Sequence, residues 1–466
     1  MRACASLLLF LALAIAAGLI LGLNGCGDNP SDSQHVIVIF QENRTPDNLF
    51  QDPVLKSRGA DIADRGINSK GETIPLQKIV LGSAFDVDHS HYAFLAMYAD
   101  GAMTGADRVT PICKAEVLDC IPTHPQFSYV DPAEVQPYFQ MAEQYTFGDR
   151  MFQTNQGPSF PAHQFIIAGT SAPASRSPLF ASENPHSFIP TTDEFINLNA
   201  GCVAPPYEYV NLIDPTGTAN QTMYPCFDHV TLIDLLEAKG ISWRYYAPSQ
   251  GSIWTGPNAI QHICQPQPKD GTTVCTGSLW SNVTFPQTEV LKDIIANRLP
   301  EVSWVIPDGP ASDHAGNTGA NLGPSWVASI VNAIGNSPYW KNTTIIVTWD
   351  DWGGWYDHVA PKVINSYEYG FRVPLIVISP YAQRGYISHV THDFGSILKF
   401  IEKKYGLPSL GYADAMADDL SDCFDYNQTP ATFQTIPAPI PMDHFLNLRR
   451  PSDGSNPDPD LDPDDD

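Results

Sequence analysis

The sequence predicts an α/β fold in which a mostly parallel central sheet is flanked by helices. Three apolar runs rich in β-branched residues have the composition of parallel strands that are covered on both faces: "HVIVIF" at 35–40, "TIIVTW" at 344–349 and "VPLIVIS" at 373–379. Helical patterns alternate with these runs, as they do in parallel sheets. The chain of 466 residues is long enough for one large α/β domain or two ordinary ones.

Two segments beside these strands predict helices. "SWVASIVNAIGN" (325–336) precedes the second strand, and "FGSILKFIEKKYG" (394–406) follows the third and ends in basic residues and a glycine. The range of about 173–277 is different, because it is dense in Pro, Asn, Thr and Cys. We expect it to be a disulfide-tied insertion or cap over the sheet of a domain at 27–450, with a helix and a strand in "HVTLIDLLEAKGISWRYY" (229–246).

The two ends of the chain differ from the body. A single Arg2 precedes an apolar stretch from Leu7 to Leu23, and "LNGC" ends at Cys26, which predicts an export signal over 1–26, of lipoprotein type if Cys26 is lipidated. We therefore expect a periplasmic, cell-surface or secreted protein, with membrane attachment through lipidated Cys26 as one outcome. A transmembrane anchor is the alternative, although about 17 residues is short for a span. Residues 451–466, "PSDGSNPDPDLDPDDD", predict a disordered acidic tail.

The charge balance bears on the partners. With 25 basic and 51 acidic residues, the chain has a formal net charge of −26. Such a chain repels polyanions, so nucleic acid is not expected as a partner.

The cysteines agree with an oxidising compartment. Apart from Cys4 and Cys26, six fall into pairs that are close in the sequence and separated by loops rich in Pro, Asn and Gly, and we expect these pairs to be disulfides: Cys113 with Cys120, Cys202 with Cys226, and Cys264 with Cys275. Cys423 is left over. A metal cluster is the alternative, but the C-x-x-C spacing is missing.

Acidic residues follow two of the predicted strands. The first strand runs into "QENR", which places Glu42 and Asn43 at its carboxyl end, and the block "IIVTWDDWGGWYDHV" places Asp350 and Asp351 directly after the second. Ligands of open α/β sheets gather beyond the carboxyl ends of the strands. Three carboxylates and an amide oxygen at one edge are stable together only around a cation, which predicts a metal site. The alternative for the two aspartates is an ordinary acidic turn.

Ser159 lies in "NQGPSFPAHQFIIAGTS" (155–171), where Gly157 and Pro158 predict a turn and an apolar helix follows. A serine at the N-cap has its hydroxyl at the positive end of the helix, a place that favours phosphate. The alternative is that Ser159 is only a cap. Histidines in polar loops, His89 and His91, His314 and His358, add to the candidate site, although each one alone fits a structural role.

Six blocks in this order resemble the bacterial phosphoesterase family that includes non-haemolytic phospholipases C and secreted acid phosphatases. They are "VIVIFQENRTPDNLF", "DVDHSHYAFLAMYADGAMTG", "NQGPSFPAHQF", "EVSWVIPDGPASDHAGN", "TIIVTWDDWGGWYDHVAP" and "YGFRVPLIVISPYAQRGYISHVTHDFGSILKFIEKKYGLP". The resemblance covers about residues 35–425 and implies an alkaline phosphatase-like α/β fold. It also implies a set of site residues: Glu42, Asn43, Asp350 and Asp351 as metal ligands, Ser159 as the nucleophile, and His89, His314 and His358 as active-site histidines.

The resemblance implies a metal-dependent phosphoester hydrolase that acts through a phosphoserine, of the phospholipase C or the acid phosphatase type, on a phosphoester or phospholipid substrate. The metal would be a divalent ion, for which Ca²⁺ and Zn²⁺ are both compatible. The family block "GP[ST]xPN" has Asn where this chain has Ala162, which bears on substrate choice and rate. The competing class is a non-catalytic cell-surface lipoprotein that binds calcium on a degenerate phosphoesterase fold, in which changing Ser159 would alter no activity.

Overall fold

The computed structural model describes residues 34–113, 117, 119–187, 199–316, 318–449, 451–452 and 454–455. The expected export segment with Cys26, and most of the expected acidic tail, lie outside these residues. Among the described residues, no helix has the length and apolar character needed to cross a membrane.

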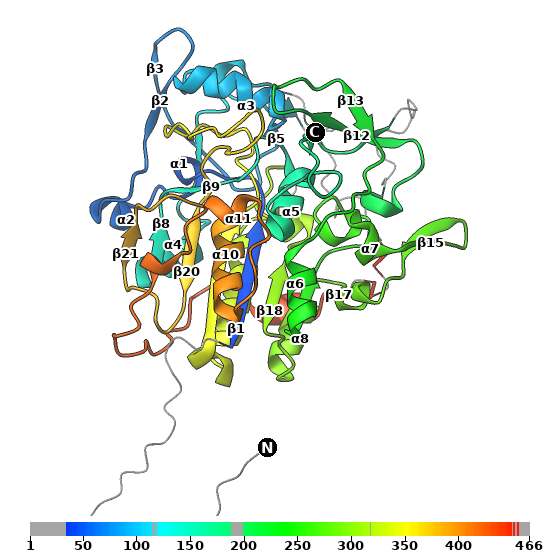
Figure 1. Ribbon diagram of the computed structural model, residues 1–466. Coiled ribbons are helices and arrows are strands. Elements are labelled where there is room, and N and C mark those ends of the chain that lie inside the picture. The colour runs from blue at the N-terminus through cyan, green and yellow to red at the C-terminus, as the bar shows by residue number, and fades with distance from the viewer. Residues whose placement is uncertain are drawn as a thin grey trace, which may run out of the picture.

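A large sheet forms the centre of the molecule (Figure 1). In the described residues its strands follow the order β17 (Val283–Thr284), β14 (Trp243–Tyr246), β18 (Val302–Val305), β1 (His35–Gln41), β19 (Thr343–Trp349), β20 (Leu375–Ile378), β8 (Thr146–Gly148) and β21 (Tyr386–Ser388). The five strands from β17 to β19 pair in parallel. All of β19, and all of β1 except His35, are buried, as expected for strands covered on both faces. The predicted α/β class is confirmed.

One strand runs against the prediction. The run at 373–379 was expected to be a parallel strand, but β20 is antiparallel to both β19 and β8. The chain leaves β19 at its carboxyl end and returns through residues 350–374 at the same edge, with no crossover helix between the two strands. Strands joined in this way pair antiparallel. Composition does not distinguish the two directions, because a central antiparallel strand is equally apolar.

Both predicted helices are present. α9 (Leu322–Gly335) begins slightly earlier than expected, and α10 (Phe394–Tyr405) ends at Gly406, which takes the left-handed conformation typical of a helix C-terminus. Figure 1 shows α10 and α6 (Leu232–Lys239) in front of the sheet. The remaining helices described are α1 (Pro46–Leu49), α2 (Pro53–Ser57), α3 (His91–Tyr98), α4 (Gln136–Gln144), α5 (Ser159–Ala168), α7 (Gln261–Cys264), α8 (Glu289–Ile295), α11 (Ala413–Met416) and α12 (Met442–Leu446).

Short strands form small accessory sheets around this core. β10 (Phe180–Ala181), β11 (His186–Ser187) and β13 (Gln221–Met223) each pair with β12 (Glu208–Ile213). The other pairs are β2 (Arg65–Ile67) with β3 (Thr73–Pro75), β4 (Gln77–Ile79) with β7 (Ser128–Val130), β5 (Phe85–Val87) with β6 (Pro111–Cys113), β9 (Met151–Phe152) with β22 (His392–Asp393), and β15 (Pro266–Lys269) with β16 (Thr272–Cys275).

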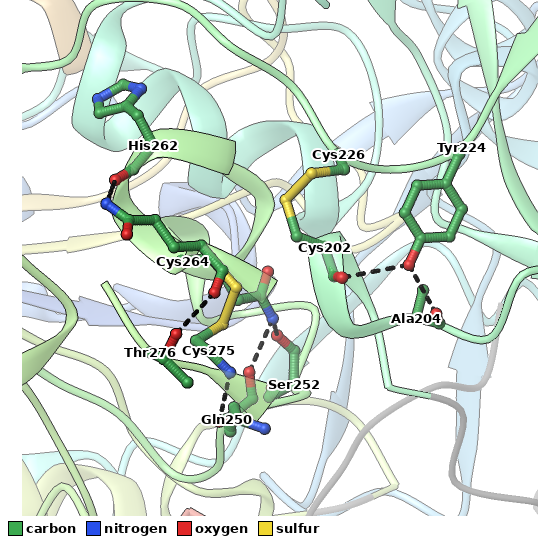
Figure 2. Close-up of a disulfide and its surroundings, with 12 residues drawn as sticks. Cys202, Ala204, Tyr224, Cys226, Gln250, Ser252, His262, Cys264, Cys275 and Thr276 are labelled. Carbon is green, nitrogen blue, oxygen red and sulfur yellow. Dashed lines mark hydrogen bonds between the residues drawn. A yellow bond between two sulfur atoms is a disulfide. The ribbon is translucent and has the colours of Figure 1, made fainter. Parts of the chain in front are cut away.

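The range 173–277 contains both accessory and central structure. Its predicted helix and strand are α6 and β14, and β14 pairs with β18 inside the central sheet. All three predicted disulfides are present: Cys113–Cys120, Cys202–Cys226 and Cys264–Cys275. Figure 2 shows the last two near each other, with the Tyr224 hydroxyl donating to the backbone oxygens of Cys202 and Ala204. The last two disulfides tie loops of this range together, whereas Cys113–Cys120 lies outside it. Cys423 is a free, buried thiol.

Candidate active site

The candidate active site lies at the carboxyl ends of β1 and β19. The two strands pair in parallel with Gln41 opposite Trp349, so Glu42 and Asp350 are the next residues of neighbouring strands at the same edge. The backbone N–H of Asp350 donates to the Gln41 oxygen at 2.9 Å, which continues the ladder to this point. Strand register therefore brings these two carboxylates together, as the sequence predicted.

The carboxylates here are buried and face one another. Glu42, Asp350 and Asp351 are each 0% exposed. Burial, and then the neighbouring Asp350 carboxylate, raise the pKa of Glu42 well above its usual value. Within the described residues, the ion-pair partner of Glu42 and Asp350 is a histidine, His163, and no Lys or Arg reaches them. In the part of the chain that the structure describes, Glu42 and Asp350 therefore have no lysine or arginine to balance their charge.

His163 is a site residue that the sequence reasoning missed. It lies on α5, one turn after Ser159, and its Nε2 is 3.3 Å from Glu42 Oε1 and 3.8 Å from Asp350 Oδ2. One ligand atom from each of these three residues lies within 4.8 Å of the others. The i, i+4 spacing to Ser159 places both side chains on one helix face, and that spacing was the available signal.

The protonation of His163 follows from its other neighbour. The Tyr245 hydroxyl donates to the Trp254 oxygen at 2.8 Å, so its own oxygen is left to accept from Nδ1 of His163 at 3.3 Å. With the proton on Nδ1, Nε2 presents a lone pair to the Glu42 edge. Burial lowers the pKa of His163 to about 4, so the ring is neutral at pH 7. A neutral imidazole aimed at two carboxylates is the arrangement of a metal ligand.

Asn43 is oriented by His89. The Nδ1 of His89 contacts the Val87 oxygen at 2.9 Å, and its Nε2 accepts from the Asn43 amide nitrogen at 3.0 Å. This contact directs the amide oxygen of Asn43 the other way, and that oxygen is buried without a hydrogen bond. Asn43 also has a left-handed backbone, with φ of 65°, and its N–H donates to Asp350 at 3.2 Å. His89 thus positions a candidate ligand.

Ser159 is brought to the same carboxylates. The structure makes Pro158 the N-cap and Ser159 the first residue of α5, not the N-cap that the sequence indicated. The Ser159 hydroxyl makes no capping bond and lies 3.2 Å from Asp351 Oδ2 and 3.5 Å from Glu42 Oε2. A cap serine would have its oxygen engaged by the helix backbone. The shift by one residue therefore leaves the hydroxyl oriented toward the acidic edge.

Two glycines allow the close approach of the loops that carry these residues. Gly353 has a φ of +63°, and a Cβ there would lie 2.4 Å from the backbone oxygen of Asn43. Its N–H donates to Asp351 Oδ1 at 2.8 Å, which fixes that carboxylate. A Cβ at Gly157 would lie 2.4 Å from the Tyr367 hydroxyl. Any other residue at these two positions would displace the loops that hold Asn43, Asp351 and Ser159.

His314 lies beside His89. The two rings are 5.8 Å apart in an edge-to-face arrangement. Nδ1 of His314 contacts the Ala315 oxygen at 2.9 Å, and in the described part of the chain its Nε2 has no hydrogen-bond partner. His91 has a different role, because its Nδ1 contacts the Gln156 oxygen at 2.8 Å and so ties α3 to the loop before Ser159. His314 therefore has a ring nitrogen without a hydrogen-bond partner in the described residues, and it lies beside the His89 that orients Asn43.

His358 is held in a second group of charged residues. Its Nδ1 is 2.7 Å from Asp47 Oδ2 and its Nε2 is 2.9 Å from Asp61 Oδ1, so both ring nitrogens are engaged. Arg372 binds Asp357 through two contacts of 2.8 and 2.9 Å and reaches Asp47 at 3.2 Å. We call Asp47, Asp61, Asp357, His358 and Arg372 the Asp47 group. The structure thus brings His358 to this group rather than to Ser159.

The residues at the carboxyl ends of β1 and β19 fit a divalent cation. We call Glu42, Asn43, Ser159, His163, Asp350 and Asp351 the Glu42 group. One carboxylate oxygen of Asp350 and the amide oxygen of Asn43 are buried and make no hydrogen bond, although each is a strong acceptor. Oxygen-rich sites with one imidazole suit Zn²⁺, and the oxygen atoms alone suit Ca²⁺. The buried acidic and histidine cluster is therefore compatible with a divalent metal.

Comparison with known proteins places the chain in a family. Residues 33–408 match the model of the Phosphoesterase family. Because the match covers most of the chain, the protein belongs to this family, and the resemblance drawn from the six sequence blocks is confirmed.

The relatives found are phospholipases C of low identity. The chain is 24% identical over 460 residues to the non-hemolytic phospholipase C of Pseudomonas aeruginosa. The aligned region covers 88% of this chain but only 60% of that protein. It is 22% identical over 461 residues to phospholipase C A of Mycobacterium tuberculosis, covering 88% of this chain and 80% of that protein. A solved protein of the alkaline phosphatase superfamily from Vibrio parahaemolyticus is similar at 12% identity with a TM-score of 0.34, over 62% of this chain and 66% of that one.

Proposed function

We propose that this member of the Phosphoesterase family is a metal-dependent phosphoester hydrolase in which Ser159 is the nucleophile. The observation that carries the proposal is the position of the Ser159 hydroxyl, which has no capping bond and lies 3.2 Å from Asp351 and 3.5 Å from Glu42. A serine held against buried carboxylates, at the N-terminus of a ten-residue helix, has the surroundings of an activated nucleophile for phosphorus.

The residues divide the chemistry as follows. Asp351 accepts the hydroxyl proton of Ser159 as the Oγ–P bond forms and the bond from phosphorus to the leaving oxygen breaks, which gives a phosphoserine. His314 enters this step doubly protonated, with its Nδ1–H directed at the Ala315 oxygen, and donates the Nε2 proton to the leaving oxygen. A water molecule then gives a proton to Nε2 of the now neutral His314 as the water oxygen bonds to phosphorus. The bond from phosphorus to Oγ breaks, Asp351 returns its proton to Oγ, and the phosphate product leaves.

A divalent cation would be held by Glu42, Asn43, Asp350 and Asp351, to which His163 adds a nitrogen ligand. When bound, it supplies positive charge that stabilises the Ser159 alkoxide and the phosphoryl oxygens. His89 acts on this set only through Asn43, whose amide it orients at 3.0 Å. We propose that the metal is either Ca²⁺ or Zn²⁺, because the oxygen and nitrogen donors of the site suit both.

The substrate proposed is a phospholipid or another phosphoester. The names of the two bacterial relatives support a phospholipase C, and the Ser159 chemistry is shared with phosphomonoesterases. The test is to measure hydrolysis of phosphatidylcholine, a soluble phosphodiester and a phosphomonoester by the purified protein, with and without a chelator. We expect hydrolysis that chelation abolishes and that one divalent metal restores. Hydrolysis that survives complete removal of metal would contradict the ligand set.

We further propose that the chain is exported and that Cys26 becomes its lipidated first residue. The three disulfides support an oxidising compartment, since such bonds are rare where thiols are kept reduced. Membrane fractionation and mass analysis of the N-terminal peptide test this. We expect a lipid-modified Cys26 in the membrane fraction and a soluble protein after Cys26→Ser. An unprocessed N-terminus starting at Met1 would overturn the proposal.

A further inference from the structure

We propose that His392, Asp422 and Cys423 form a second, structural zinc site, distant in the sequence from the Glu42 group. Ligand atoms of these three residues lie within 4.8 Å of one another. His392 and Cys423 are each 0% exposed, and Asp422 is partly exposed, so an ion could enter from the Asp422 side. The site would join β22 and the edge strand β21 to the short 3₁₀ helix Ser421–Cys423.

The distances between the ligand atoms fit a tetrahedral zinc ion. Nε2 of His392 is 3.5 Å from Asp422 Oδ1, and Sγ of Cys423 is 3.7 Å from the same oxygen. With usual zinc bond lengths of about 2.1 Å to nitrogen or oxygen and about 2.3 Å to sulfur, tetrahedral geometry separates N from O by about 3.4 Å and S from O by about 3.6 Å. These two distances therefore match those between zinc ligands, and all three ligand atoms lie within 4.8 Å of one another.

The surroundings of His392 also match a ligand histidine. Its Nδ1 faces Asp418 Oδ1 at 3.0 Å in an ion pair that lacks hydrogen-bond geometry, and this nitrogen is otherwise buried without a partner. Metal-bound histidines commonly have a carboxylate on the second ring nitrogen, which orients the ring. The Ser388 hydroxyl lies 3.1 Å from Nε2 and also donates to Asp422 Oδ2, so it links two of the ligand side chains.

The backbone holds the ligands in place without a metal. The oxygen of Cys423 accepts from the N–H of Gln383 at 2.9 Å and from the Thr146 hydroxyl at 3.0 Å, and the oxygen of Asp422 accepts from the Gln383 amide at 2.6 Å. A thiolate and an imidazole together favour Zn²⁺ over Ca²⁺ or Mg²⁺. Cys423, which has no disulfide partner, thus acquires a role.

The site would stabilise the approach to Ser159. β22 (His392–Asp393) pairs with β9 (Met151–Phe152), and the chain runs from β9 directly to Ser159. Thr154, between them, accepts a hydrogen bond from the Phe394 N–H at 3.0 Å. An ion at His392 would therefore fix a strand that supports the nucleophile loop, and would contribute to stability without touching the substrate.

Cobalt(II) tests the site, because a cobalt–thiolate bond gives an intense near-ultraviolet charge-transfer band and the Glu42 group contains no sulfur. We expect metal-free wild-type protein to develop this band as cobalt(II) is added, and zinc to remove it by displacement. Asp350→Asn should keep the band. Cys423→Ser and His392→Gln should lose it while retaining the circular dichroism of the folded protein. Wild-type protein without the band, or a band that survives Cys423→Ser, would overturn the proposal.

A thermal measurement keeps the test valid if one variant folds poorly. Zinc should raise the unfolding midpoint of Asp350→Asn by several degrees, because binding to the folded state alone stabilises it. The double variant with Asp350→Asn and Cys423→Ser should show no such rise. An equal rise in both proteins would assign the effect to other ligands and refute the site. Neither result depends on hydrolysis, so the proposed function stands or fails separately.

Discussion

The Glu42 group and the Asp47 group both bury several carboxylates beside a histidine, but they balance that charge differently. In the Asp47 group, the guanidinium of the fully buried Arg372 donates to both carboxylate oxygens of Asp357 and also contacts Asp47. In the Glu42 group, no Lys or Arg of the described residues reaches Glu42 or Asp350. Buried carboxylates need a positive charge, and only one of the two groups supplies it from the chain.

The pKa values follow the same division. The pKa of His358 is raised from 6.5 to about 9, because the Asp47 and Asp357 carboxylates outweigh the effect of its burial, which acts in the opposite direction. The pKa of His163 falls to about 4, because burial dominates there. Both groups have carboxylate and histidine atoms at metal-ligand spacing. Spacing alone therefore does not identify a metal site, and the absence of a guanidinium beside Glu42 and Asp350 in the described residues supports the proposal of a metal there.

The largest effect is expected at Ser159, the proposed nucleophile in the Glu42 group. Ser159→Ala removes the attacking oxygen and no capping bond, so the variant should fold while its turnover falls by about 1,000-fold or more. Steady-state hydrolysis and thermal unfolding measure the two properties. Acid quench of the wild type during turnover should also leave phosphate on the peptide that contains Ser159.

The matched control is Ser175→Ala, at an exposed serine whose backbone N–H bonds to Asp228. It should keep the wild-type rate. Near-normal turnover by a folded Ser159→Ala protein would show that water attacks phosphorus directly. No hydrolysis by the wild type of any phosphoester would instead support the non-catalytic calcium-binding alternative.

The second-largest effect is a difference in the free energy of unfolding between variants of the two groups. Arg372→Gln leaves Asp357 and Asp47 buried without their cation, and should lower the free energy of unfolding by about 3–5 kcal/mol. Asp350→Asn removes one of the facing carboxylates of the Glu42 group. In metal-free protein it should therefore leave the stability unchanged or raise it. Urea unfolding in the presence of a chelator measures both.

The control for the arginine is Arg384→Gln, at an exposed side chain that donates to the Thr429 oxygen. It should cost about 0.5 kcal/mol or less. If Asp350→Asn destabilised the metal-free protein as strongly as Arg372→Gln, the Glu42 group would already be balanced by the chain, and the need for a metal would disappear.

The sequence predicted the strand ends well because register is local. Glu42 comes two residues after its apolar run and Asp350 one residue after its own, and the parallel pairing of β1 and β19, with Gln41 opposite Trp349, brings them together. The disulfides were predictable for the same reason, since each joins cysteines close in the sequence. Ser159 was found by its Gly-Pro turn, and was misplaced by a single residue at the helix start.

The remaining features depend on contacts between distant residues. His358 resembled a site histidine because it follows an aspartate in a polar loop, but its partners Asp47 and Asp61 lie about 300 positions away and could not be read from that loop. His163 was missed because it lies in an apolar helix, where a histidine is usually structural. The predicted direction of β20 was wrong, because the direction of a strand depends on the route of the preceding connection and not on the composition of the strand itself.

A smaller effect is expected at His163. Its Nε2 contacts the Glu42 group and its Nδ1 is held by Tyr245, so His163→Asn should lower activity or metal affinity by about 10–100-fold. Tyr245→Phe keeps the ring but removes its partner, and should show part of the same loss. Metal titration followed by activity measures both. His444→Asn, at an exposed histidine on α12, is the control. Equal rates in His163→Asn and wild type would exclude His163 from the site.

The smallest effect is a pH dependence that belongs to the Asp47 group. Because the pKa of His358 rises from 6.5 in the unfolded chain to about 9 in the fold, the folded state binds its proton more tightly. The resulting stability is fully present below pH 6.5 and is lost as the pH rises through 9, by about 1–2 kcal/mol once solvent screening of this partly exposed side chain is allowed for. The pKa of His262, which lies between Asp228 and Asp234, is also raised to about 9, so this histidine contributes to stability in the same pH window.

Urea unfolding at several pH values between 6.5 and 9 measures this dependence. The free energy of unfolding should fall with pH in the wild type, fall less steeply in His358→Asn and in His262→Asn, and fall least in the double variant. Unchanged slopes in all three variants would mean that neither histidine is charged in the fold, and the Asp47 group would then rest on Arg372 alone.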